Sequence, residues 1–88
     1  MQGFIAPEVY EGNYNHKSDW WSVGVILHLL LTGKFPVTGL PNQMQERTKN
    51  FKFNMNSKIL SGLSYAARDF LSNLLQTDPD DRMSHNVL

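Results

Sequence analysis

The feature that most constrains this sequence is an apolar run over residues 20–31, interrupted only by single small or polar residues. Ser18 and Asp19 precede the run. A serine side chain can cap the free amide groups at the start of a helix, and a carboxylate is favoured beside the positive end of the helix dipole. Gly33 follows the run and suits the residue that ends a helix. The pattern therefore predicts a helix over residues 18–32.

Apolar side chains lie on nearly every face of this predicted helix. A helix of that kind is buried on all sides, so we expect it at the centre of the fold. Its twelve-residue apolar run falls short of the ~20 residues that span a bilayer. Acidic residues precede the run, and it has neither a basic start nor a small-residue cleavage site, so it is not typical of a signal peptide. We expect no membrane association and a cytoplasmic chain.

The neighbouring segments are short. A proline in the first turn favours a brief helix over residues 7–10, and the turn-rich residues 11–17 are typical of a loop. Residues 34–41 are expected to form an irregular connector, followed by a short, exposed helix at best over residues 42–49. Over residues 50–55 apolar and polar residues alternate, which predicts an extended segment with one buried face.

A clear amphipathic helix is predicted over residues 64–76, with Ser64 as its N-cap. Its apolar residues recur at the spacing of one helix face, and they are Ala67, Phe70, Leu71, Leu74 and Leu75. Pro79 ends this region, because proline disfavours the helical conformation in the residue before it. Ser84 is expected to cap one more helix. The sequence therefore predicts a mainly α fold.

The charge balance and the absence of cysteine exclude several functions. Eight basic and eight acidic residues cancel, whereas proteins that bind nucleic acids or anionic membranes carry a basic excess. No cysteine is present, which excludes a disulfide framework, a zinc–thiolate site and a cysteine nucleophile. We expect neither nucleic acid nor membrane as a partner.

Local spacing indicates no metal site and no catalytic group. No pair among His16, His28 and His85 has the i, i+3 or i, i+4 spacing that brings two imidazoles onto one metal. His28 is expected to be a packed histidine with one hydrogen bond. The acidic residues 78–81 resemble the start of a calcium loop but lack its glycine. No Gly-x-Gly phosphate loop and no Gly-x-Ser-x-Gly elbow is present.

Four blocks, taken together, resemble the eukaryotic protein kinase family. Residues 4–9 (Phe-Ile-Ala-Pro-Glu-Val) are similar to the Ala-Pro-Glu end of the activation segment. Residues 19–24 (Asp-Trp-Trp-Ser-Val-Gly) resemble the Asp-x-Trp-Ser-x-Gly segment that opens the central helix of the large lobe. Residues 29–36 resemble its Leu-Leu-x-Gly-x-x-Pro ending, and residues 74–82 the later Leu-Leu-x-x-Asp-Pro-x-x-Arg segment. The residues in these blocks are most similar to those of serine/threonine kinases of the calcium/calmodulin-dependent type.

The resemblance implies a C-terminal part of a kinase large lobe over residues 1–88, truncated at both ends. It comprises the end of the activation segment, the central buried helix and the helices that follow. Glu8 would pair with Arg82 in a buried salt bridge, and Asp19 would hold the backbone of the catalytic loop. Ile26 and Leu30 would support the apolar stack beneath the adenine pocket, since their i, i+4 spacing places them on one face. The remaining structural motif residues implied are Ala6, Pro7, Trp21 and Gly24.

Three residues would face the substrate by resemblance. Gly3 and Phe4 fall in the substrate-binding loop that follows the position of Met1, where the family often has threonine. Leu29 occupies a position that is acidic in some kinases directed to basic substrates. A preference for arginine through that contact is therefore not expected here.

The kinase segments that supply phosphate, metal and base contacts are missing from the sequence: the glycine-rich loop, the strand lysine, the His-Arg-Asp loop and the Asp-Phe-Gly motif. We therefore expect no catalytic, cofactor-binding or metal-binding residue in this chain, and ATP and Mg²⁺ to be bound only by a complete domain. Expected partners are a missing N-terminal kinase half or another protein, a protein substrate of the complete domain, and a second copy of the chain. The alternatives are a non-catalytic kinase remnant that acts as an interaction module, and an unrelated small helical protein.

Overall fold

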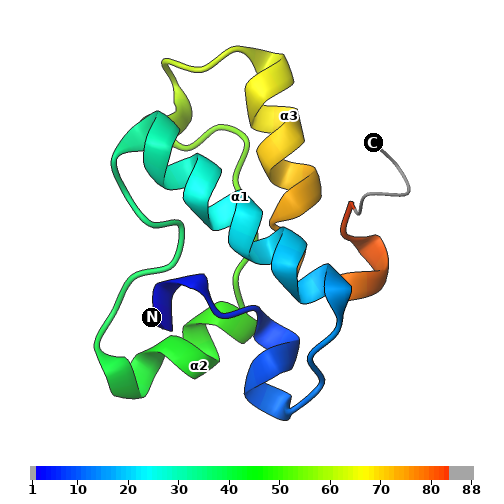
Figure 1. The fold of residues 1–88 in the computed structure, drawn as a ribbon. Coiled ribbons are helices and arrows are strands. Elements are labelled where there is room, and N and C mark those ends of the chain that lie inside the picture. The colour runs from blue at the N-terminus through cyan, green and yellow to red at the C-terminus, as the bar shows by residue number, and fades with distance from the viewer. Residues whose placement is uncertain (1, 84–88) are drawn as a thin grey trace.

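The computed structural model describes residues 2–83, which form three α-helices and four 3₁₀ turns without a strand (Figure 1). The predicted mainly α fold is confirmed. In chain order the elements are η1 (Gln2–Phe4), η2 (Pro7–Glu11), α1 (His16–Thr32), α2 (Pro41–Lys49), η3 (Lys58–Leu60), α3 (Tyr65–Leu74) and η4 (Pro79–Asp81).

Helix α1 crosses the middle of the molecule (Figure 1). Helix α3 packs along one side of it, and η1, η2 and α2 lie on the other. The Cα trace extends 35 × 33 × 18 Å along its principal axes. Because packed helix axes lie ~8–10 Å apart, the shortest dimension allows two layers of helices and leaves none to cover the outer side of α1.

The start of α1 differs from the prediction that Ser18 is its cap. The cap is Asn15, whose side-chain oxygen accepts a hydrogen bond from Lys17 N at 2.8 Å. Ser18 lies inside the first turn, where its Oγ accepts a hydrogen bond from Asn15 N at 3.3 Å. Asparagine and serine are both good caps, so sequence alone placed the start one turn late. The predicted end is confirmed, since Gly33 has a left-handed φ of 75°.

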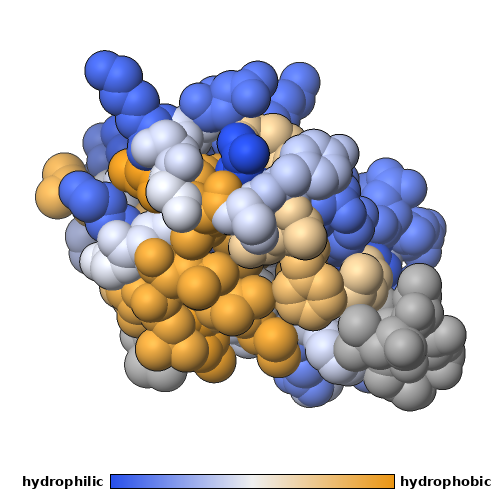
Figure 2. All heavy atoms as spheres, turned by 90° about the horizontal axis from the view of Figure 1, so that it is seen from above, coloured by the Kyte–Doolittle hydropathy of each residue, from blue (hydrophilic) through white to orange (hydrophobic). Residues whose placement is uncertain are grey.

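The prediction that α1 is buried on all sides is wrong within the described residues. Four apolar side chains on its outer side are exposed, with fractions of 42, 47, 77 and 42% for Val23, Ile26, Leu30 and Leu31. We call these four residues the open face of α1. The space-filling view in Figure 2 shows apolar side chains gathered in one patch. No helix within residues 2–83 has the length and apolar content of a membrane span.

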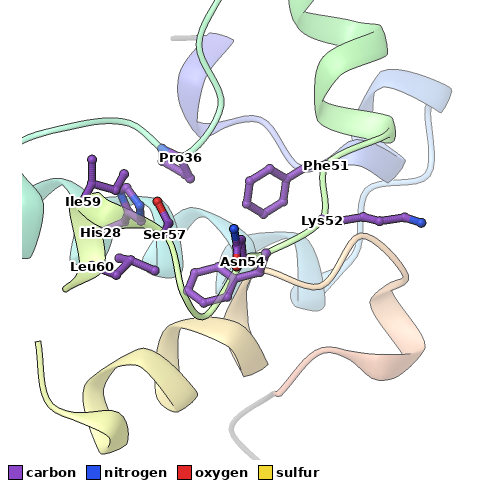
Figure 3. Close-up of a pocket in the computed structure, with 9 residues that line it drawn as sticks. His28, Pro36, Phe51, Lys52, Asn54, Ser57, Ile59 and Leu60 are labelled. Atoms are coloured by element: carbon purple, nitrogen blue, oxygen red, sulfur yellow. The ribbon is translucent and has the colours of Figure 1, made fainter.

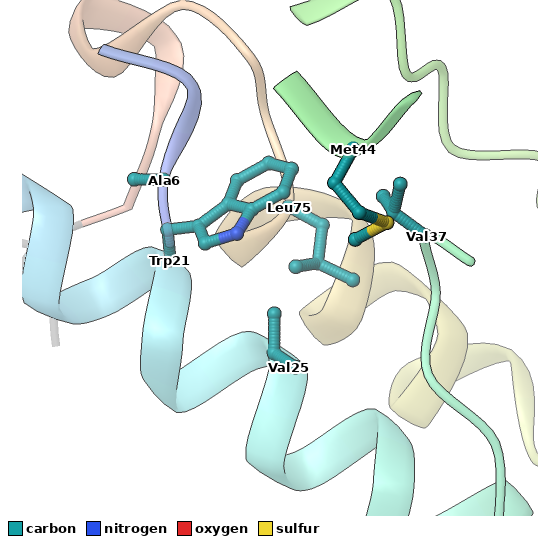
Figure 4. Packing of buried hydrophobic residues seen from close by; sticks show 6 residues of the cluster. All are labelled: Ala6, Trp21, Val25, Val37, Met44 and Leu75. Atoms are coloured by element: carbon teal, nitrogen blue, oxygen red, sulfur yellow. The ribbon is translucent and has the colours of Figure 1, made fainter. Parts of the chain in front are cut away.

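The opposite side of α1 forms the core. Trp21 and Val25 pack with Ala6, Val37, Met44 and Leu75 in one buried cluster (Figure 4). Next to it, Gly24 allows α3 to approach closely, because a Cβ at this position would lie 2.8 Å from Leu74 Cβ. The chemical reason for a glycine in the middle of this helix is therefore the contact with α3.

The remaining elements follow the sequence in outline. Helix α2 starts at Pro41, one residue earlier than predicted, because proline is well tolerated in the first helical position. It is not wholly exposed, since Met44 and Thr48 are buried. Residues 50–55 form no strand. Phe51, Phe53 and Met55 are half-buried while Lys52 and Asn54 between them are exposed, which confirms the single buried face.

Helix α3 is capped as predicted by Ser64, whose Oγ accepts a hydrogen bond from Ala67 N at 3.1 Å. It ends at Leu74 rather than Gln76. Phe70, predicted on the apolar face, is 37% exposed because nothing in residues 2–83 packs over it fully. The loop predicted over residues 11–17 is shorter at both ends, since η2 includes Glu11 and α1 begins at His16. The helix predicted from Ser84 lies outside the described residues.

Candidate functional site

Glu8 and Arg82 form a buried ion pair that joins the two ends of the described chain. Arg82 Nη1 donates to Glu8 Oε2 at 2.7 Å, and Arg82 Nη2 donates to Glu8 Oε1 at 3.0 Å. Only 7% of Glu8 and 4% of Arg82 is exposed. Two parallel hydrogen bonds make this the strong, bidentate form of an arginine–carboxylate pair. The structure thus brings together the two residues that the resemblance pairs.

Every N–H group of the Arg82 guanidinium has a partner. Besides the two bonds to Glu8, Arg82 Nε and Nη2 donate to the Gln76 carbonyl at 2.9 and 2.8 Å, and Nη1 donates to the Lys17 carbonyl at 2.8 Å. The guanidinium also lies 5.3 Å from the centre of the Trp21 ring, within cation–π range. Arg82 therefore fastens η2, the first turn of α1 and the segment after α3 to one another.

The Glu8 carboxylate has a third hydrogen bond, donated by Ser18 Oγ to Oε2 at 2.8 Å. Burial raises the pKa of Glu8, but the hydrogen bonds from Arg82 and Ser18 and the positive charge of Arg82 outweigh it. The net result is a pKa below the ordinary value. Glu8 therefore stays ionised at neutral pH, as the ion pair requires.

Asp19 lies exposed on the first turn of α1. Tyr14 Oη lies 2.9 Å from each of its carboxylate oxygens, and a phenol has one proton to donate. This hydrogen bond raises the pKa of Tyr14, with further contributions from desolvation and from the Asp19 charge. The carboxylate keeps free lone pairs, and it lies at a hollow of about 220 Å³ that is also lined by Phe4, Ile5 and Ser22. It can therefore accept hydrogen bonds from a second segment.

Two of the three residues expected to face the substrate lie close together. The ring of Phe4 packs edge-on against Phe35 at 5.2 Å, and a Cβ on Gly3 would lie 2.9 Å from the same ring. Gly3 lines a hollow of about 250 Å³ with Val37, Met44 and other residues of the 35–44 segment. Leu29 is half-buried on α1 and lines neither this hollow nor the one beside Asp19.

The other motif residues divide between core and surface. Ala6, Pro7, Trp21 and Gly24 are buried around α1. Ile26 and Leu30 belong to the open face, as their shared spacing indicates. Their side chains are thus available to pack against a further segment.

Comparison with known proteins decides the family. The protein kinase domain model matches residues 1–88. The chain belongs to the protein kinase family.

The curated relatives of this kinase chain include calcium-dependent enzymes. It is 35% identical over 82 residues to calcium-dependent protein kinase 31 of Arabidopsis thaliana, over 92% of this chain and 17% of that protein. It is 39% identical over 83 residues to the calcium and calcium/calmodulin-dependent serine/threonine-protein kinase DMI-3 of Medicago truncatula, over 92% of this chain and 16% of that protein. The predicted resemblance to serine/threonine kinases of this type is confirmed.

Solved structures agree. A twitchin kinase fragment from C. elegans superimposes with a TM-score of 0.82 at 38% identity, over 93% of this chain and 19% of that chain. The twitchin kinase region from the same organism gives a TM-score of 0.80 at 36% identity, over 93% of this chain and 15% of that chain. The kinase chain described here therefore spans less than a fifth of the length of these relatives.

The described part of this kinase chain does not fit a magnesium–nucleotide site. Kinases hold the nucleotide phosphates and Mg²⁺ with a glycine-rich loop, a lysine and acidic side chains. Within residues 2–83 no three His, Asp or Glu side chains form a group that could hold a metal ion. Asp78, at the position that resembled a calcium loop, instead accepts a hydrogen bond from Asp80 N at 2.9 Å and caps η4.

Two contacts of this site could not be found from the sequence. Ser18 was expected to cap a helix, and its donation to Glu8 depends on how η2 docks against α1. Tyr14 lies in a predicted loop, five residues before Asp19. Neither the helical spacing of three or four residues nor the strand spacing of two predicts a contact between them. A tyrosine shortly before a helix-starting aspartate is the signal that could have indicated this pair.

Proposed function

We propose that residues 1–88 are the C-terminal part of a serine/threonine protein kinase domain that, when complete, transfers phosphate from ATP to protein serine or threonine. The Glu8–Arg82 pair is the observation that carries this proposal. In a chain of this family, it ties the end of the activation segment to the helices that close the large lobe. The low coverage of the relatives supports a domain that extends beyond these residues.

Within that domain we assign supporting roles to the residues of this chain. The free lone pairs of Asp19 accept backbone N–H groups of the catalytic loop, and Tyr14 holds the carboxylate in place. The open face of α1 packs against the kinase half that carries the nucleotide. Gly3 and Phe4 lie in the loop that meets the protein substrate.

The sequence of the transcript upstream of Met1 tests this proposal directly. We expect the reading frame to continue into segments that encode a His-Arg-Asp loop and an Asp-Phe-Gly motif. A transcript whose reading frame starts at Met1 and has no such segments would instead favour a non-catalytic kinase remnant that acts as an interaction module. The open face of α1 is the feature that would then serve as the binding surface of a non-catalytic module.

The isolated 88-residue chain is predicted to show no protein kinase activity. Phosphoryl transfer depends on positioned phosphates, metal ions and a catalytic aspartate, and within residues 2–83 no group of three His, Asp or Glu side chains could hold a metal ion. The measurement is transfer of labelled phosphate from ATP to a generic basic protein, with a complete serine/threonine kinase as the positive control. Incorporation clearly above a kinase-free reaction would contradict the prediction.

The isolated chain is also predicted to associate with itself through the open face of α1. All four side chains of this face are apolar. Burying a leucine is worth ~1.5–3 kcal/mol, so Leu30→Glu should weaken association about tenfold or more. Analytical ultracentrifugation measures the effect, and Leu40→Glu is the control, because Leu40 is 62% exposed but lies outside the face. A monomer at high concentration with a cooperative melt would contradict the prediction and favour an independent module.

A further inference from the structure

A cavity of about 110 Å³ lies between α1, residues 51–54 and η3, away from the site described above. Its walls are mainly apolar and include Pro36, Phe51 and Leu60 (Figure 3). Phe53 adds a further apolar side chain, and the uncharged polar residues Asn54 and Ser57 also line the cavity. The side chain of Lys52 extends away from the cavity in this view, and no acidic residue lines it. The interior therefore presents neutral groups.

His28 is the one buried polar residue that lines this cavity. It is 2% exposed, and its Nδ1 lies 2.6 Å from the Lys34 carbonyl oxygen and 3.3 Å from Thr32 Oγ1. Because a carbonyl oxygen only accepts, Nδ1 must carry the proton. The sequence prediction of a packed histidine with a hydrogen bond is confirmed by this contact.

The hydrogen bond at Nδ1 fixes the chemistry of the other ring nitrogen. A neutral imidazole with a proton on Nδ1 has a lone pair on Nε2 that can only accept. Both contacts of the ring are at Nδ1, so Nε2 has no partner among residues 2–83. This acceptor is not sealed from solvent, since Trp21 Nε1 is the only fully buried side-chain nitrogen or oxygen without a partner in the described residues. His28 lines the cavity, from which a donor can reach the ring.

We propose that this cavity binds a small neutral aromatic alcohol, whose hydroxyl donates to His28 Nε2 and whose ring lies against Phe51, Phe53 and Leu60. Mainly apolar walls with a few directed polar groups are typical of small-molecule sites. A closed cavity of about 150 Å³ holds benzene. The volume of 110 Å³ here suits one ring, because the cavity opens to solvent at its rim and need not enclose the whole molecule. This proposal does not depend on the proposed kinase function.

The test compares phenol with toluene, which has nearly the same shape but no hydroxyl donor. The full-length protein is titrated with each probe, with calorimetry for affinity and ¹⁵N NMR of the histidine side chains for the state of Nε2. We expect saturable binding of phenol about tenfold tighter than that of toluene, the effect of one hydrogen bond. We also expect a shift of the His28 Nε2 resonance on saturation.

Variants separate the hydrogen bond from the cavity. His28→Asn can keep an N–H donor for the Lys34 carbonyl, but its shorter side chain places no acceptor at the position of Nε2. The preference for phenol should therefore disappear while toluene binding remains. Leu60→Phe fills the cavity and should remove binding of both probes. His16→Asn, an exposed histidine on the same helix, is the control and should behave like the parent protein.

Three results would overturn the proposal: no saturable binding of phenol, equal affinity for phenol and toluene, or an unchanged preference in His28→Asn. If His28→Asn fails to fold, the affinity ratio and the Nε2 shift of the parent protein decide the question.

Discussion

Replacing Glu8 or Arg82 by alanine is expected to lower the free energy of unfolding by about 3–5 kcal/mol in each case, the range for a buried pair that loses one partner. The cost arises because the other charge stays buried without its counter-ion. For Arg82→Ala, the carbonyls of Gln76 and Lys17 also lose their donors. Urea melts followed by circular dichroism measure both effects.

The double variant is the decisive control for this pair. A single variant leaves one buried charge without its partner, and the second substitution removes that charge. The double variant should therefore lose clearly less free energy of unfolding than the sum of the two single variants. Asp80→Ala is the matched surface control, because Asp80 contacts Lys17 at 3.7 Å but its side chain is 89% exposed. It should change stability by less than about 1 kcal/mol. Simple additivity of Glu8→Ala and Arg82→Ala would show that the two residues do not interact.

The pH dependence of the free energy of unfolding should also reveal the contribution of the Glu8–Arg82 pair. The folded-state pKa of Glu8 is lowered, so its contribution is present above the unfolded-state pKa of about 4.3. It is lost as the pH falls through the folded-state value. The parent protein should therefore lose more stability on acidification than Glu8→Gln, which has no carboxylate to protonate.

Local chemistry predicts the parts of this fold that depend only on nearby residues. Ser64 caps α3 and Gly33 ends α1 as expected, because a capping hydroxyl and a left-handed glycine act within one helical turn. The start of α1 was misplaced because Asn15 and Ser18 offer the same chemistry one turn apart. The choice between them depends on Glu8, which uses the Ser18 hydroxyl.

Burial was predicted less well, because it depends on which neighbours are present. An apolar side chain at Leu30 indicates that the helix has a partner, but not whether that partner lies within the same residues. The structure leaves Leu30 77% exposed. In the same way, the alternation around Phe51 and Phe53 predicted a buried face correctly but not the absence of strand pairing, since nothing in residues 2–83 offers an edge to pair with.

The site required more than local patterns. Glu8 and Arg82 are 74 residues apart, and no periodicity links a carboxylate to a guanidinium over that distance. Their pairing followed from the family resemblance alone. Neither local patterns nor the family resemblance predicted the Tyr14–Asp19 contact or the free Nε2 of His28. Both depend on how loops fold back on α1.

The close approach of α3 to Gly24 gives the second large effect. Gly24→Val is expected to lower the free energy of unfolding by about 3 kcal/mol, the upper part of the usual range for overpacking. A Cβ at this position would lie 2.8 Å from Leu74 Cβ and 3.0 Å from Leu75 Cδ2, so α3 must move away from α1. Urea melts measure the loss.

Alanine substitutions at Gly24 and Gly62 compare a glycine packed against a neighbouring helix with one in an open turn. On an exposed helix, glycine to alanine stabilises by up to ~1 kcal/mol. At Gly24 the contact with Leu74 should outweigh this gain, so that Gly24→Ala is destabilising. Gly62→Ala, in the turn before α3, is the control for a glycine without close neighbours, because a Cβ there has nothing within 4 Å. It should stay within about 0.5 kcal/mol of the parent protein. If Gly24→Ala instead stabilised the protein as it would an exposed helix, α3 would not pack against α1 at this point, and the core that holds Trp21 and Leu75 together would have to be arranged differently.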